Sequence, residues 1–192
     1  MRKRRFILAL AAVLVIPVAQ SLGAVFVDKN FDQLVTEAEQ IFVGTVTAAQ
    51  SRKSPTGAIL TDVTFSDLQV LKGNAVVSQI VLNVLGGTVG AETFKLSGIP
   101  EFQTGVRYLV FSKGNGTTIF PVVGVDQGLF QIKHDSVSGR DLVFNAYGVP
   151  ITSSTVRDAM PNTSAPPLDP NLPPEPITVD TFIQAIKTRL SQ

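Results

Sequence analysis

Apolar and polar residues alternate through most of the chain between residues 41 and 146, in short segments rich in β-branched and aromatic side chains. Such alternation is typical of half-buried strands, because successive side chains of a strand point to opposite faces. Turn residues separate the segments every 8 to 15 positions. We predict strands at residues 41–47, 59–71, 76–85, 106–111, 119–123, 128–133 and 142–146, with a short edge piece at 149–151. The pattern indicates a mainly β fold, either a small antiparallel barrel or a sandwich.

The longest of these segments, residues 59–71, changes the side on which its main apolar residues lie. They occupy odd positions up to Phe65 and even positions from Leu68 onward. The inward-facing phase therefore shifts near Ser66 and Asp67. A bulge or a sharp bend explains such a shift most simply, and it lets one strand serve two sides of a small barrel.

A short helix is expected to open the domain. Its apolar residues, which recur at helical spacing, are Phe31, Leu34, Val35 and Ala38. Asn30 precedes them, and asparagine is a favoured N-cap because its side chain accepts a hydrogen bond from a free backbone N–H of the first turn.

The last residues, 177–192, predict an amphipathic helix with Thr178 as its N-cap. A helix of about 13 residues is marginal alone in water, so its apolar face must pack on another surface. It docks either on the chain's own β-domain or on a partner protein. In the second case, the partner-binding face consists of Phe182, Ile183, Ile186 and Leu190.

The first 24 residues have the pattern of a secretory signal peptide. Basic residues at positions 2–5 precede an apolar stretch at 6–16, and Pro17 separates that stretch from several small residues. The 11 apolar residues are too few for a membrane-spanning helix, which needs about 20. We therefore expect cleavage, with a mature chain that begins at Ala24 or Val25.

Removal of the signal peptide changes the sign of the net charge. Residues 1–24 hold four of the 16 Lys and Arg residues and none of the 15 Asp and Glu residues. The mature chain thus has 12 basic and 15 acidic residues, a formal charge of −3. This balance gives no reason to expect nucleic acid or an anionic membrane surface as a partner. No second long apolar run follows, so we expect no membrane anchor after cleavage.

The chain contains no cysteine. An exported protein without cysteine has no disulfide framework, no thiol catalysis and no thiolate metal site. Small exported eukaryotic domains commonly use disulfides, so this composition favours a bacterial protein in the periplasm or the extracellular medium.

Prolines mark the boundary between the β-rich region and the last helix. Residues 160–176 contain seven of the 12 prolines and predict an extended linker. The expected organisation is a signal peptide at 1–24, a β-barrel domain at 25–159, the linker at 160–176 and the helix at 177–192.

Residues suited to catalysis are sparse. His134 is the only histidine, which excludes a metal site that needs two imidazoles. A hydrolase would have to combine His134 with a serine and a carboxylate such as Asp135 or Asp141. The other carboxylates are scattered, and no calcium-loop motif is present. We therefore predict no catalytic residue, no metal and no cofactor.

The segment from Gly86 to Phe102 is long for a connection in a compact β-domain, and loops of this length are often functional. It begins with Gly-Gly-Thr-Val-Gly but lacks the Lys-Ser/Thr pair of a phosphate-binding loop. We predict a binding site here, although its aromatic residues also suit the core. The predicted binding residues are Thr88, Glu92, Phe94, Lys95, Phe102 and Tyr108.

Several motifs follow one another between residues 31 and 133: Phe31-Asp32-x-Leu34-Val35 up to Ala38, Ile41-Phe42-Val43-Gly44-x-Val46, Val70-Leu71-Lys72-Gly73, Gly86-Gly87, Gly105-x-x-Tyr108-Leu109-Val110-Phe111 and Pro121-Val122-Val123-Gly124. Their order resembles that of a group of small exported bacterial domains of undefined function. More remotely, it is similar to the netrin-like domains, to which the tissue inhibitors of metalloproteinases belong. The resemblance implies a five-stranded OB-like barrel with a binding role. In those inhibitors an N-terminal cysteine chelates the catalytic zinc, and this chain has no cysteine for that contact.

These observations together lead us to expect an exported, non-catalytic β-barrel module that binds a protein or a component of the bacterial envelope. Two alternatives remain open. One is an accessory or inhibitor of a secreted protease, and the other is a small hydrolase that uses His134.

Overall fold

The computed structural model describes residues 28–152 and 176–192. The expected signal peptide and nearly all of the Pro-rich linker lie outside these residues. The described part is mainly β, as predicted, and contains a six-stranded antiparallel sheet in the order β3-β2-β1-β6-β7-β8. The strands are β1 (Gln40–Lys53), β2 (Ile59–Lys72), β3 (Ile80–Leu85), β6 (Arg107–Ser112), β7 (Leu129–Asp135) and β8 (Arg140–Asn145).

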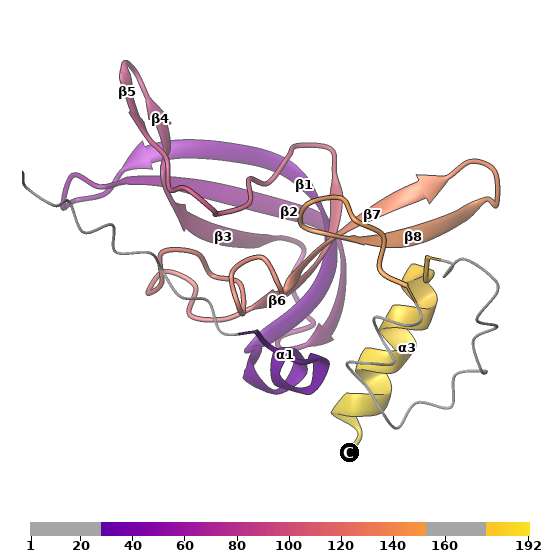
Figure 1. The fold of residues 1–192 in the computed structure, drawn as a ribbon. Helices are drawn as coiled ribbons and strands as arrows, with labels where there is room; N and C mark the ends of the chain where they lie inside the picture. The colour runs from indigo at the N-terminus through magenta and orange to yellow at the C-terminus, as the bar shows by residue number, and fades with distance from the viewer. Residues whose placement is uncertain (1–27, 153–175) are drawn as a thin grey trace, which may run out of the picture.

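A second, two-stranded sheet is the hairpin of β4 (Gly87–Val89) and β5 (Glu92–Phe94). It projects from one end of the molecule, whereas the helices α1 (Phe31–Glu37) and α3 (Val179–Leu190) lie together at the other end (Figure 1). No helix in the described ranges is long and apolar enough to cross a membrane.

The bulge predicted in the long second strand is confirmed. The register between β1 and β2 shifts between Val43 and Thr45, whose partners are Gln69 and Ser66. Asp67 has a positive φ of 52°, which is unusual for a residue with a side chain. β2 stays paired with β1 on both sides of the bulge, and its first half, which also pairs with β3, extends toward the hairpin.

Within the described residues, the strands do not close into the OB-like barrel that was predicted as one of two architectures. Residues 119–123, predicted as a strand, are not a strand. This segment nevertheless bridges the gap between β3 and β6. Leu85 N donates to Ile119 O (2.8 Å), and Val122 forms an isolated bridge with Ser112 of β6. Pro121 has no N–H to donate, which prevents a continuous ladder here. The result is a strongly curved open sheet with a loop across its opening.

Two predicted strand boundaries were wrong, and one predicted loop contains two short strands. β3 begins at Ile80 instead of residue 76, because Asn74 accepts a hydrogen bond from Val76 N in a local turn and Val76 remains 91% exposed. The first strand continues six residues beyond 47, since its polar second half still pairs with β2. The 86–102 segment, predicted as a loop, contains the hairpin. Residues 149–151, predicted as a short edge piece, form no strand among the described residues, but they make isolated backbone contacts with β8 and, through Ile151 O, with Ile177 N.

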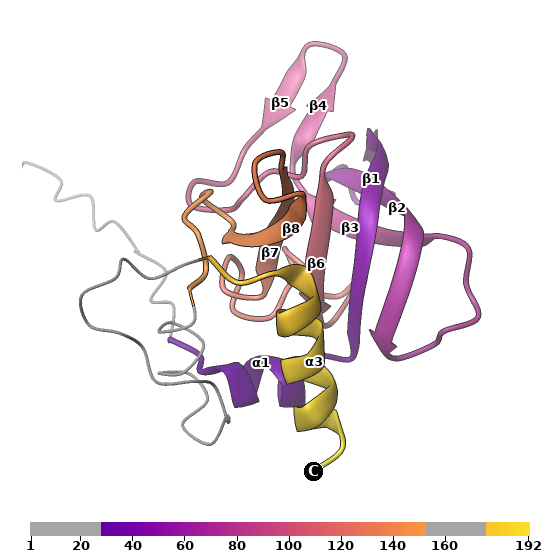
Figure 2. The ribbon, with the colours of Figure 1, turned by 90° about the vertical axis from the view of Figure 1, so that its right-hand side faces the viewer.

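Both predicted helices are confirmed together with their N-caps. Asn30 and Gln33 form a reciprocal capping box at α1, in which each side chain accepts from the other's backbone N–H (both 2.9 Å). Thr178 Oγ1 accepts from Thr181 N at the start of α3. Figure 2 shows α3 crossing in front of α1 beside the sheet.

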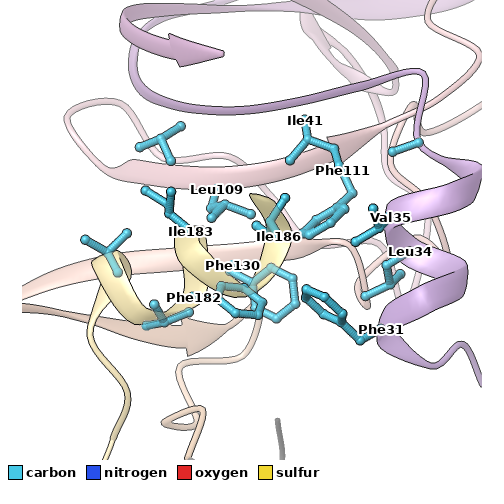
Figure 3. Packing of buried hydrophobic residues seen from close by; sticks show 14 of the residues in the cluster. Phe31, Leu34, Val35, Ile41, Leu109, Phe111, Phe130, Phe182, Ile183 and Ile186 are labelled. Atoms are coloured by element: carbon cyan, nitrogen blue, oxygen red, sulfur yellow. The ribbon is translucent and has the colours of Figure 1, made fainter. Parts of the chain in front are cut away.

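The apolar side chains form two clusters, one on each side of the curved sheet. The first lies beneath the helices, where Phe182 of α3 packs against Phe31, Phe111 and Phe130 with ring centroids 5.0 to 6.5 Å apart (Figure 3). The second, which we call the inner cluster, contains Phe42, Val46, Val63, Phe65, Ile80, Leu82, Tyr108, Val110, Phe120, Val122 and Leu129. The candidate site adjoins the inner cluster.

Candidate binding cavity

A cavity of about 350 Å³ lies between the sheet and the segment 86–102. Its volume falls in the range of small-molecule pockets, about 300–1,000 Å³. The sheet contributes Ala49, Ser51, Thr61, Val63, Val84 and Leu85. The opposite wall consists of residues 86–88, 94–96 and 99–102. Because Val63 belongs to the inner cluster and Ile99 and Phe102 pack against it, the cavity is an open extension of the core.

A pair of hydroxyl groups fixes the segment 86–102 to the sheet. Ser51 of β1 and Thr61 of β2 are cross-strand partners, and their side-chain oxygens lie 2.9 Å apart. Thr61 Oγ1 donates to Gly86 O (2.7 Å), and Ser51 Oγ accepts from Thr88 N (3.2 Å). These hydroxyls are therefore engaged by the protein itself.

Two consecutive glycines make this close approach possible. Gly86 and Gly87 have φ values of 112° and 128°, which residues with a Cβ rarely adopt. A Cβ on Gly87 would overlap the side-chain oxygens of Ser51 and Thr61, and one on Gly86 would crowd the carbonyl oxygen of Phe94 in β5. Glycine at 87 is thus required by the contact with the sheet, and glycine at 86 by the contact with the hairpin.

The charged groups of the cavity lie at its mouth. Among the residues that line it, the ionisable side chains are Lys95 and Glu101, which pair with each other (Nζ to Oε1 2.9 Å) and are 68% and 72% exposed. The floor is formed by aliphatic side chains of β1, β2 and β3 and by the engaged hydroxyls, and the opposite wall adds the aromatic rings of Phe94 and Phe102. An apolar, uncharged group would enter it without leaving a charge unpaired.

The opposite face of the same strands is polar. Asp62 accepts hydrogen bonds from Arg52 Nε (2.6 Å) and Asn83 Nδ2 (2.6 Å), which join β1, β2 and β3 across the sheet. The Arg52 guanidinium holds the pKa of the Asp62 carboxyl below its ordinary value, with a smaller contribution from Asn83. This network keeps the cavity-bearing ends of the three strands in register.

The structure brings four of the six predicted binding residues together. Thr88, Phe94, Lys95 and Phe102 all line the cavity, and Phe94 is 44% exposed at its edge. Glu92 does not line it and instead pairs with Lys53 (Nζ to Oε1 2.7 Å). These four residues come from the hairpin and from the loop behind it.

The prediction of Tyr108 as a binding residue was wrong. Its side chain is fully buried in β6, between β1 and β7, and its hydroxyl accepts a hydrogen bond from Gln103 N (3.0 Å). Burial raises the pKa of the Tyr108 hydroxyl. Tyr108 supports the site indirectly, because its ring packs edge-on against Phe102 (5.4 Å between centroids).

The residues on the sheet side of the cavity were not predicted from the sequence. Ala49, Ser51, Thr61 and Val63 occupy alternate positions of two paired strands, so their side chains share one face. The alternation was a usable signal in residues 59–71. It was hidden in the polar half of β1, where the inward side carries only the small side chains of Ala49 and Ser51 and no large apolar residue.

His134 lies on β7 and does not line the cavity. Its Nδ1 is 2.9 Å from Asp141 Oδ1, and Arg107 binds the other oxygen of the same carboxylate (3.2 Å). Among the described residues, no serine forms a hydrogen bond with the imidazole, whose partner is the Asp141 carboxylate. The pairing of His134 with Asp141 is that of an exposed cross-strand pair, with the imidazole 64% exposed.

The helix face predicted to bind a partner is largely inside the protein's own core. Phe182, Ile183 and Ile186 are 0–4% exposed in the cluster beneath the helices, whereas Leu190 is 36% exposed. In this arrangement the first three side chains offer no surface to a partner. The structure thus supports docking of α3 on its own β-domain.

A smaller cavity of about 260 Å³ lies near α1 and α3, with Phe31, Phe130 and Tyr147 in its wall. Burial and the neighbouring Asp126 carboxylate raise the pKa of the Tyr147 hydroxyl.

A scan against protein-family models, a search of curated proteins and a search of solved structures each found no match to this chain.

Proposed function

We propose that this protein is a non-catalytic binding module that holds an uncharged, apolar group of its ligand in the cavity between the sheet and the segment 86–102. The observation that carries this proposal is the composition of the cavity. Its floor is apolar, its hydroxyls are engaged, and its lining charges are paired at the mouth. Pockets with apolar walls and few polar groups are typical of ligand sites.

The pattern of residues 1–24 supports the further proposal that the module acts outside the bacterial cytoplasm, in the periplasm or the medium. The ligand is then a protein or an envelope component with an apolar group at its surface. We propose binding in preference to hydrolysis because the exposed His134 lies outside the cavity.

Filling the cavity tests this proposal. Replacement of Ala49 by tryptophan places a large ring at the sheet wall, because the Ala49 side chain is exposed and lines the cavity. We expect Ala49→Trp to weaken binding of the uncharged fluorophore N-phenyl-1-naphthylamine at least about tenfold, which corresponds to about 1.4 kcal/mol. The measurement is a fluorescence titration, excited where tryptophan does not absorb.

Gln50→Trp is the matched control. Gln50 follows Ala49 on the same strand, but it is exposed on the other face and does not line the cavity. This variant should bind the fluorophore as tightly as the unmodified protein. Equal affinity of Ala49→Trp and Gln50→Trp would show that the fluorophore binds elsewhere.

A further inference from the structure

The hairpin β4–β5 is joined to the rest of the domain through glycines on both sides. Gly86 is held by the sheet, since its N–H donates to Ile59 O (2.8 Å) and its carbonyl accepts from Thr61. Gly87 follows with a φ of 128°, and Gly98 on the return side has a φ of 80° with open space where a Cβ would stand. Glycine permits wide backbone rotation, so each junction can act as a pivot.

Between these pivots, the contacts with the sheet are few and polar. All three residues of β5 are exposed, and β4 approaches β1 through the 3.2 Å hydrogen bond from Thr88 N to Ser51 Oγ. At the far side, Lys53 of β1 pairs with Glu92 of β5 over 2.7 Å, with the two side chains 46% and 65% exposed. By contrast, the sheet and helices are fastened by the two buried clusters.

The hairpin also forms one wall of the cavity. Thr88, Phe94, Lys95 and Leu96 line it from this side, while the floor belongs to β1, β2 and β3. Figures 1 and 2 show the hairpin projecting beyond the sheet, with its tip away from the other elements. A swing of the hairpin therefore changes the width of the mouth and leaves the floor intact.

We propose that residues 88–97 form a flap that opens about Gly87 and Gly98, and that the Lys53–Glu92 ion pair is the latch that holds it closed over the cavity. The role of the flap in ligand binding rests on the proposed function, whereas the motion itself is inferred from the geometry alone. An exposed ion pair of this kind contributes little stability in water and is screened by salt, which suits a latch that must open readily.

Charge reversal of the latch tests the motion without any ligand. Because the chain has no cysteine, spin labels can be attached at Ala91→Cys on the hairpin tip and Gln50→Cys on β1, and the distance between them measured by pulsed electron resonance. We expect Glu92→Lys to add a longer-distance population, since it places two lysines side by side. The swapped pair Lys53→Glu with Glu92→Lys should restore the original distribution. Identical distributions in all three proteins would overturn the flap.

The same variants test the effect on binding. Stopped-flow mixing with N-phenyl-1-naphthylamine should give association and dissociation rates about 2- to 5-fold faster in Glu92→Lys, the range expected from a surface pair, and normal rates in the swapped pair. Asp28→Lys, a charge reversal at an exposed residue outside the cavity lining, controls for net charge. Unchanged rates in Glu92→Lys would overturn the latch while leaving the cavity proposal intact. Failure of every protein to bind the fluorophore, with the label distances still shifted, would contradict the proposed function and uphold the flap.

Discussion

Replacement of Phe182 by alanine should lower the free energy of unfolding by about 3–5 kcal/mol, the usual cost of removing a buried aromatic ring. Phe182 is 2% exposed, and its ring centroid lies 5.0 Å from that of Phe130 and 5.6 Å from that of Phe31. Truncation leaves a cavity between α3, α1 and the sheet that these neighbours cannot fill without moving. Urea unfolding followed by circular dichroism measures the change.

Leu190→Ala is the control for this prediction. Leu190 lies on the same helix face, one turn beyond the buried residues, but it is 36% exposed. Its truncation should change the free energy of unfolding by no more than about 0.5 kcal/mol. An equally small effect of both variants would mean that α3 does not contribute to the core, and it would reopen the interpretation of this helix as a partner-binding element.

The second large effect is expected at the double glycine. Gly87→Ala should destabilise the protein by about 2–4 kcal/mol, because alanine is strained at a φ of 128° and its Cβ would displace the hydroxyls of Ser51 and Thr61. The hairpin would then leave its position on β1, and affinity for the fluorophore should fall as the cavity loses a wall. Urea unfolding and fluorescence titration report the two effects separately.

Gly90→Ala separates backbone strain from loss of contact. Gly90, at the tip of the hairpin, also has a positive φ of 61°, but a Cβ there would meet nothing within 4 Å. We expect a cost of about 1 kcal/mol from the left-handed backbone alone and unchanged binding. If Gly87→Ala were no more damaging than Gly90→Ala, the anchoring role of the hydroxyl pair would be refuted.

Local features of the fold were predictable from the sequence because neighbouring residues determine them. The capping box at Asn30, the N-cap at Thr178 and the bulge near Asp67 each depend on a few adjacent positions. The extent of β1 and the start of β3 were not predictable in this way. The polar half of β1 is a strand because it pairs with β2. β3 begins later than predicted because the Asn74 side chain holds the preceding residues in a local turn.

The candidate site was predicted only on its loop side. The length of the segment 86–102 pointed to the hairpin wall, which is continuous in sequence. The sheet wall depends on which face of β1 and β2 meets the hairpin, and that choice is set by the long-range contact of Gly87 with Ser51 and Thr61. Tyr108 was misassigned because strand position alone does not reveal that β6 is central, with neighbours on both sides.

The most direct test of the account is to locate the apolar ligand on the protein. Amide chemical shifts of the isotopically labelled protein, followed during titration with N-phenyl-1-naphthylamine, should change at Ala49, Thr61, Val84 and Ile99, which surround the cavity. They should remain constant at Ile183, in the cluster beneath the helices. Shifts confined to the helices, or spread over the surface without saturation, would contradict the claim that this cavity is the binding site.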